Sequence, residues 1–144
     1  MGLALATQLL AEGQRVFVTC RATADQQALQ ALIGRYGAAL SILPLDVQEA
    51  AGMAEVASAV RAHTNGLDWL INNAGVMSND SLATVQEADL HQAFAINAIA
   101  PLLLTQALLP LLQEGTNPSS STSAPPLVRL GASKQECRSA IVTP

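Results

Sequence analysis

Apolar and polar positions change their spacing in a regular order along the first two-thirds of the chain. Stretches with apolar residues at helical spacing alternate with short, nearly continuous apolar runs of strand length. Alternation of this kind indicates β–α–β units, which build a parallel sheet covered by helices. The sequence therefore predicts an α/β fold with right-handed crossovers between its strands.

The helical stretches end at residues that commonly terminate helices. Helices are predicted over residues 2–12, 24–36, 49–63 and 88–112, with a shorter helical segment before the last of them. Gly13 and Gly37 follow the first two helices and suit the left-handed position after a helix. Asp46 precedes the third helix, which ends near Asn65 and Gly66.

The apolar runs predict three strands, over residues 15–20, 39–46 and 67–72. The first run is nearly all apolar, as expected for a parallel strand that is covered on both faces. Pro44 removes one backbone donor from the second strand, which indicates a position at the edge of the sheet.

The last part of the chain loses this periodicity. Residues 116–126 are rich in Ser, Pro and Thr, and residues 126–143 hold only short apolar patches. Such a composition is typical of a linker or a disordered stretch. We therefore predict one α/β domain over residues 1–115 and a Ser/Pro-rich, disordered or irregular tail over residues 116–144.

The composition excludes several classes of protein. Of the 144 residues, 50% are apolar and 12% are charged, which excludes a mainly disordered chain. The net charge is −4 with no basic stripe, so nucleic-acid binding has no electrostatic driving force. Cys20 and Cys137 fit neither a disulfide framework nor a zinc site, and His63 and His91 lie far apart in the sequence. The sequence predicts a cytoplasmic protein without a metal site.

Residues 93–112 have the length of a transmembrane helix, because these twenty residues carry no charge. Asn97, Pro101 and Pro110 interrupt the apolar run, and it has no flanking Trp, Lys or Arg anchors. These features favour a buried core helix or an interface helix over a membrane span.

The residues that follow the predicted strands are candidates for ligand binding, because the carboxyl ends of strands in an open α/β sheet border the ligand crevice. These residues are Cys20-Arg21, Asp46-Val47 and Asn72-Asn73-Ala74-Gly75. Glycine lets a flat ligand approach the backbone, and asparagine amides can meet ribose hydroxyls or tie loops together. A tight turn fits the last of these segments as well, since turns are rich in Asn and Gly.

Residues 67–75, Leu-Asp-Trp-Leu-Ile-Asn-Asn-Ala-Gly, resemble the short-chain dehydrogenase/reductase family, whose members carry an Asn-Asn-Ala-Gly signature after their fourth strand. Three further landmarks follow in the family's order. Gly2-Leu3-Ala4-Leu5-Ala6 is similar to the end of the glycine-rich cofactor loop, Asp46-Val47 to the pair beside the adenine, and Asn97 to the first member of the Asn-Ser-Tyr-Lys catalytic set. Thr19-Cys20-Arg21 looks most like the carbonyl-reductase-type members. The resemblance covers about residues 2–113.

The resemblance implies a partial NAD(P)-binding Rossmann domain over residues 1–115, and hydride transfer between a nicotinamide and a carbonyl or alcohol carbon. It implies NADP (NADPH) as the cofactor, because Arg21 stands where an NAD site usually has an acidic residue and suits a 2′-phosphate. The alternative for this arginine is a solvated cap residue. Asn97 is the implied catalytic residue, and the implied cofactor-binding residues are Gly2, Leu3, Arg21, Asp46, Val47, Asn73, Ala74 and Gly75.

The resemblance also implies partners. The helix over residues 88–112 matches the one that packs across the family's dimer interface, and its apolar surface is wider than one core-facing stripe requires. We therefore expect a homo-oligomer that uses this helix. The expected substrate is a small carbonyl compound, and neither nucleic acid nor membrane is expected as a partner.

The sequence departs from the family pattern at both ends. The family's opening strand and the first two glycines of its loop have no counterpart, and Leu130 stands at the tyrosine position of a Tyr-x-x-x-Lys motif that would end at Lys134. The serines within residues 119–123 follow no apolar strand. Tyr36, the single tyrosine, lies on the helix beside the adenosine half of the site.

We therefore expect a doubly wound sheet that lacks the family's first strand and its C-terminal strands. We expect the chain as printed to be inactive, because leucine has no proton to donate. The alternatives are a non-catalytic protein that associates through its long apolar helix and a membrane-anchored chain.

Overall fold

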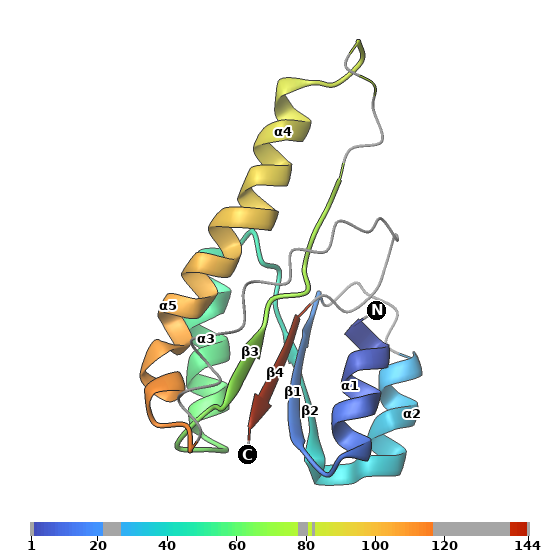
Figure 1. Cartoon of the computed structure of the whole chain (residues 1–144), viewed down its shortest axis with the longest axis vertical. Coiled ribbons are helices and arrows are strands. Elements are labelled where there is room, and N and C mark those ends of the chain that lie inside the picture. Colours follow the sequence, from blue (N-terminus) through green and yellow to red (C-terminus); the bar gives the residue numbers. More distant parts are fainter. Residues whose placement is uncertain (1, 22–26, 78–80, 82, 117–138, 144) are drawn as a thin grey trace.

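A mixed sheet of four strands, in the order β2-β1-β4-β3, organises the chain (Figure 1). The computed structural model describes residues 2–21, 27–77, 81, 83–116 and 139–143. β1 (Arg15–Cys20) runs parallel to β2 (Leu40–Pro44), whereas β4 (Ser139–Thr143) runs antiparallel to both β1 and β3 (Trp69–Ile71). β1, β2 and β3 are therefore parallel to one another. The predicted α/β class and the partial Rossmann-type sheet are confirmed.

Helices cover both faces of this sheet (Figure 1). α1 (Gly2–Ala11) and α2 (Gln27–Tyr36) lie on one face. α3 (Ala50–Arg61) and α5 (Ala100–Gln113) lie on the other. This arrangement makes the buried side chains of the strands form two separate cores.

β1 supplies side chains to both cores, because successive residues of a strand point to opposite sides. Phe17 belongs to the core between the sheet, α3 and α5. Val16, Val18 and Cys20 belong to the core under α1 and α2. All four side chains are buried, which confirms that the strand is covered on both faces.

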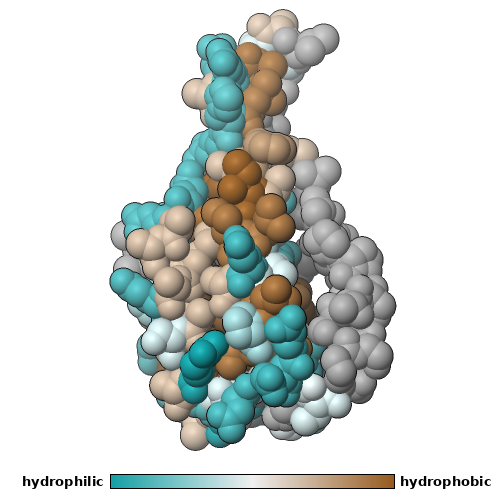
Figure 2. All heavy atoms as spheres, turned by 90° about the vertical axis from the view of Figure 1, so that its left-hand side faces the viewer, coloured by the Kyte–Doolittle hydropathy of each residue, from teal (hydrophilic) through white to brown (hydrophobic). Residues whose placement is uncertain are grey.

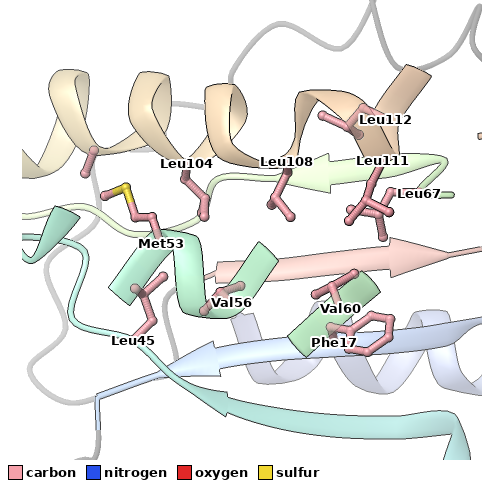
Figure 3. Close-up of a cluster of buried hydrophobic side chains, with 11 residues drawn as sticks. Phe17, Leu45, Met53, Val56, Val60, Leu67, Leu104, Leu108, Leu111 and Leu112 are labelled. Carbon is pink, nitrogen blue, oxygen red and sulfur yellow. The ribbon is translucent and has the colours of Figure 1, made fainter. Parts of the chain in front are cut away.

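The core beside α3 and α5 is almost entirely aliphatic (Figure 3). α3 contributes residues that lie three or four positions apart, and α5 contributes leucines at the same spacing. This spacing allows the side chains of the two helices to interdigitate. Its buried members are Phe17, Leu45, Met53, Val56, Val60, Leu67, Ala100, Leu104, Leu108, Leu111 and Leu112. Burial of each large side chain contributes about 1.5–3 kcal/mol.

The element boundaries agree closely with the predicted ones. β1 has the predicted bounds, and Gly13 and Gly37 have φ values of +82° and +54°, the left-handed conformation expected after a helix. η1 (Gly37–Ala39), a short 3-10 turn, joins α2 to β2. β2 is the outer strand beside β1 in the described sheet, as Pro44 indicates. Asp46 does not cap α3, since the N-cap residue is Glu49.

The segment Ser139–Thr143 corrects the prediction of an irregular tail from residue 116 onward. These residues form β4, which pairs with β1 and β3 inside the sheet. The short apolar run Ala140-Ile141-Val142 carries no period of its own, and its pairing partners lie more than a hundred residues earlier in the case of β1. Residues 117–138, the rest of the predicted tail, lie outside the described residues.

The long helix is continuous from Glu87 to Gln113 and has three parts: α4 (Glu87–Phe94), the π-helical turn η2 (Ala95–Ile99) and α5. α5 packs on the core, whereas α4 extends beyond the end of the sheet (Figure 1). By length and composition this helix could cross a membrane, and 33% of its apolar stretch is buried inside the structure. The shorter helix predicted before residue 88 is wrong for the described residues between β3 and α4, which hold only a turn near residues 83–84.

Candidate nucleotide site at the carboxyl edge

The carboxyl ends of β1, β2 and β3 lie at the same edge of the sheet, because the three strands are parallel. This edge carries Arg21 after β1, Asp46 after β2 and Asn72 after β3. The backbone N–H of Leu45 donates to the carbonyl oxygen of Cys20 at 2.9 Å, which joins the first two strand ends. The three predicted ligand-binding segments therefore meet at one edge.

α1 begins at this edge as well. The helix precedes β1 and runs back along the sheet, so Gly2 lies near the carboxyl ends and Ala11 near the amino ends (Figure 1). Gly2 is buried, and Leu3 packs against the core under α1 and α2. The first N–H groups of a helix have no intrahelical acceptor and carry a partial positive charge, which favours an anion at this place.

The segment after β1 offers a cation to solvent. Arg21 is exposed, whereas the thiol of Cys20 is free and buried behind it. Residues 19–22 contain no acidic side chain. An arginine in this environment can pair with a phosphate group through two parallel hydrogen bonds.

The Asp46-Val47 pair forms the turn that leads from β2 into α3. The Oδ1 of Asp46 accepts the backbone N–H of Gln48 at 3.0 Å, and its carbonyl oxygen accepts the N–H of Glu49 at 3.0 Å. Val47 is half-buried and packs against the core between α3 and α5. This turn holds Asp46 in place and leaves Val47 as an apolar wall of the edge.

The segment 72–77 after β3 forms no turn, so the tight-turn alternative for Asn72-Asn73-Ala74-Gly75 is excluded. Asn73, Ala74 and Gly75 are half-buried, and the chain runs on from β3 beyond the sheet at this point (Figure 1). Gly75 has no side chain, so a planar ligand can approach the backbone closely there.

Asn97 holds this segment against the long helix. Its Nδ2 donates to the carbonyl oxygen of Val76 at 2.7 Å, and its Oδ1 accepts the backbone N–H of Val76 at 2.9 Å. Asn97 lies in the π-helical turn η2, and turns of this kind interrupt α-helices frequently at functional sites. The sequence indicated Asn97 but not its partner, because the two residues lie 21 positions apart and no local pattern signals the contact.

Several other candidates lie away from the edge. Tyr36 ends α2 at the opposite, amino edge of the sheet, where the Arg35 guanidinium lies 5.2 Å from the centre of its ring. His63 packs its ring edge-on against Phe17 at 6.0 Å between centroids, and His91 pairs with Glu87 on the surface of α4 at 3.3 Å. Within the described part of the chain, no group of three or more His, Cys, Asp or Glu side chains is placed to hold a metal. Leu130, Lys134 and the serines of residues 119–123 lie outside the described residues.

Comparison with known proteins gives one consistent family. The profile described as enoyl-(acyl carrier protein) reductase matches residues 1–124. The L-xylo-3-hexulose reductase of Hypocrea jecorina is 31% identical over 133 residues, covering 78% of this chain and 44% of that protein. The short-chain dehydrogenase srdF of Neurospora crassa is 40% identical over 93 residues, covering 61% of this chain and 37% of that protein.

Solved structures agree with these relatives. The NADPH-bound carbonyl reductase from chicken fatty liver has 37% sequence identity and a TM-score of 0.72, covering 79% of this chain and 48% of that structure. The RhlG/NADP complex of Pseudomonas aeruginosa has 29% identity and a TM-score of 0.67, covering 78% of this chain and 44% of that structure. The chain thus spans less than half the length of these proteins.

Proposed function

The chain belongs to the short-chain dehydrogenase/reductase family, and on that premise we propose that the carboxyl edge of its sheet binds an NADP-type dinucleotide for hydride transfer at a carbonyl or alcohol carbon. One observation carries the proposal. The ends of three parallel strands and the N-terminus of α1 meet at one edge. Two of the similar solved structures, the chicken carbonyl reductase and the RhlG complex, are described as holding NADPH and NADP, which supports this cofactor class.

The residues at the edge suit the parts of such a nucleotide. The first backbone N–H groups of α1, at Gly2 and Leu3, would hold the pyrophosphate, and the exposed Arg21 guanidinium would pair with a 2′-phosphate. Asp46 and Val47 would border the adenine, since the turn they form presents one carboxylate and one apolar wall. The segment of Asn73, Ala74 and Gly75 would lie along the ribose nearer the nicotinamide.

A bound nicotinamide supplies the hydride in this chemistry. Asn97 contributes by position rather than by contact, because both polar atoms of its carboxamide bond to the backbone of Val76. It would hold the backbone of residues 73–75 at a fixed distance from the long helix. Proton transfer to a carbonyl oxygen requires a positioned acid, and the printed sequence has leucine at the expected tyrosine position. We propose that the chain as printed binds nucleotide without turnover.

Association through the long helix is a second proposed function, and a specific surface favours it. α4 has no buried residue, and the apolar side chains along α4, η2 and α5 form a stripe on this side of the molecule (Figure 2). Phe94 is 63% exposed and Leu102 is 68% exposed, with Leu90, Ile99 and Leu109 also exposed. Exposed apolar stripes of this kind are usually buried in an interface with another protein. We propose that the partner is a second copy of the chain, in a cytoplasmic homo-oligomer.

Calorimetric titration of the purified chain with NADPH and NADH tests the nucleotide proposal. We expect heat of binding for both and tighter binding of NADPH, because only NADPH carries the 2′-phosphate that Arg21 would meet. ATP, which lacks the nicotinamide half and the 2′-phosphate, is the control ligand. Equal affinity for all three, or binding of none at millimolar concentration, would contradict the proposal.

A further inference from the structure

Asn65 and Gly66 form the single Asn-Gly pair of the sequence and lie in the segment that leads from α3 into β3. The side chain of Asn65 is exposed to solvent, whereas Gly66 is buried. Within the described part of the chain, no hydrogen bond holds the carboxamide of Asn65. This side chain can therefore fold back toward the backbone that follows it, as asparagine side chains commonly do in turns.

Packing requires a glycine at position 66. A Cβ there would lie 2.5 Å from the carbonyl oxygen of Glu114 and 2.8 Å from its carbonyl carbon. The next residue, Leu67, donates its N–H to the carbonyl oxygen of Leu111 at 2.8 Å, and the two side chains belong to the same core (Figure 3). The approach of α5 to β3 thus places after Asn65 the residue type that shields its own backbone nitrogen least.

The hydroxyl of Thr64 contacts both polar groups of Gly66. The N–H of Gly66 donates to Oγ1 of Thr64 at 3.3 Å, which is longer than the usual limit of about 3.2 Å for such a bond. The same hydroxyl donates to the carbonyl oxygen of Gly66 at 2.9 Å. Thr64 therefore restrains the glycine mainly through its carbonyl group and holds the nitrogen only weakly.

We propose that Asn65 is a site of spontaneous modification, at which the backbone nitrogen of Gly66 attacks the side-chain amide carbon of Asn65. A bond forms between these two atoms, the bond from that carbon to the amide nitrogen breaks, and the proton of the Gly66 N–H leaves with the nitrogen as ammonia. Water then opens the resulting cyclic succinimide. Addition at the side-chain carbonyl carbon gives aspartate, and addition at the main-chain carbonyl carbon gives isoaspartate.

Isoaspartate at position 65 would disturb the contact between α5 and β3. Its main chain runs through the former side chain, so the backbone between Thr64 and Gly66 becomes longer by one carbon atom. Gly66 cannot take up this length by moving toward α5, because the Glu114 backbone leaves no room there. Both products also add a carboxylate near the C-terminal end of α3, where a negative charge is unfavourable. Arg61 in the last turn of α3 can offset that charge but not the added carbon.

Incubation of the folded full chain at mildly alkaline pH tests the proposal. Peptide mass mapping follows the loss of the amide, and an isoaspartate-specific methyltransferase labels the rearranged product. Asn73 and Asn97 are internal controls, because each precedes an alanine. We expect Asn65 to convert about tenfold faster than either, since glycine leaves the attacking nitrogen unshielded. Conversion of Asn65 only after unfolding in urea, or no faster than at the two controls, would overturn the proposal.

Two valine variants test the part played by Thr64. Thr64→Val removes the hydroxyl that restrains Gly66, so conversion of Asn65 should become roughly threefold to tenfold faster, the range that one neutral hydrogen bond accounts for. Thr105→Val removes a hydroxyl that donates to the carbonyl oxygen of Pro101 at 2.7 Å within α5, and it should leave the rate unchanged. Slower conversion in Thr64→Val, or equal acceleration in both variants, would contradict the restraint.

Thermal unfolding of the purified isoaspartyl form measures the consequence of the modification. The matched control is Asn65→Asp, which carries the same charge without the longer backbone. We expect the isoaspartyl form to unfold at a midpoint about 4 °C lower than this variant. Equal midpoints would exclude the effect on the contact between α5 and β3. None of these measurements requires a nucleotide, so their outcome is independent of the proposed function.

Discussion

The carboxamide of Asn97 and the backbone of Val76 exchange two hydrogen bonds, of 2.7 and 2.9 Å, across 21 positions of the chain. The side chain donates one hydrogen bond and accepts another, as the backbone of a neighbouring strand would. It pairs the segment after β3 with a helix instead of a strand. Asn97 lies in the π-helical turn η2, which places its carboxamide beside Val76. The position of the segment after β3 therefore depends on this irregularity of the helix.

Loss of the Asn97 carboxamide should therefore loosen the edge. We expect Asn97→Ala to lower the free energy of unfolding by about 1–3 kcal/mol, because the half-buried N–H and carbonyl of Val76 lose their partners. Asn97→Asp should cost at least as much, since a carboxylate accepts but cannot donate to the carbonyl oxygen of Val76. Gln92→Ala, an exposed position on the same helix, is the control and should stay within about 0.5 kcal/mol. Urea titration measures all three, and equal stability of the alanine variants would exclude this role.

Arg21 should determine the preference between the two nicotinamide nucleotides. Arg21→Ala should weaken NADPH binding by about tenfold to a hundredfold, the range of a hydrogen bond to a charged group, and leave NADH binding unchanged. Arg35→Ala removes the same charge at the opposite edge of the sheet, beside Tyr36, and should change neither affinity. Calorimetry gives both constants. Parallel losses for NADPH and NADH would mean that Arg21 does not contact a 2′-phosphate.

Two glycines allow the end of α5 to lie against the start of β3. A Cβ on Gly66 would come within 2.5 Å of the Glu114 carbonyl oxygen, and one on Gly115 would meet the carbonyl oxygen of Leu67. The backbones there are joined by the N–H of Leu67 donating to the carbonyl oxygen of Leu111 at 2.8 Å. Gly66→Ala and Gly115→Ala should each lower the free energy of unfolding by about 1–3 kcal/mol, because backbone must move to admit the methyl group.

Gly34→Ala is the matched control for these two variants. This glycine lies inside α2 with nothing within 4 Å of the added Cβ. Alanine should therefore stabilise the chain by about 0.5–1 kcal/mol through its better helix propensity. The three variants should separate clearly in one series of urea titrations. Similar effects at all three positions would contradict the close approach of α5 to β3.

The apolar stripe on the long helix should hold two copies of the chain together. We expect a dimer in sedimentation at micromolar concentration and a monomer for Leu102→Glu, since this side chain is 68% exposed and its loss costs the monomer little. Gln30→Glu adds the same charge at an exposed polar position of α2, on the other face of the sheet, and should remain a dimer. A monomeric parent chain, or retention in membranes after a carbonate wash, would count against this association.

The chain as printed should not turn over. Tyr36, its single tyrosine, lies at the amino edge and cannot reach a carbonyl at the carboxyl edge. A positioned proton donor contributes roughly 10²–10⁴-fold to such reactions. NADPH consumption with reactive aldehydes, quinones and diketones should equal that of heat-inactivated protein. Clear turnover would point to another acid, and Lys134 and the serines of residues 119–123 would be the first positions to substitute.

Local patterns predicted the elements that depend on local physics. β1 has the predicted bounds because Gly13 and Arg21 flank a single apolar run, and α1 and α2 end before glycines that take positive φ. Pro44 indicated an outer strand because the missing donor is a property of that residue alone. The alternation of strands and helices then predicted a parallel sheet with the three strand ends at one edge, which the strand directions confirm.

The remaining features depend on contacts that no local pattern encodes. β4 has a strand-like composition, but only the unpaired edges of β1 and β3 give its five residues a place. The hydrogen bonds between Asn97 and Val76 form because the fold brings the π-helical turn η2 next to the segment after β3. The shorter helix expected before residue 88 was wrong for the described residues between β3 and α4, because so short a helical pattern is not stable without a buried face.

The alternation of side chains along β1 has a consequence for how the molecule comes apart. Phe17 lies in one core, while Val16 and Val18 lie in the other. If either helical layer separated from the sheet, one face of β1 would be exposed to water and the strand would lose its packing contacts on that face. The two layers are therefore joined into one cooperative unit, and the amides of β1 should exchange with solvent only when the whole sheet opens.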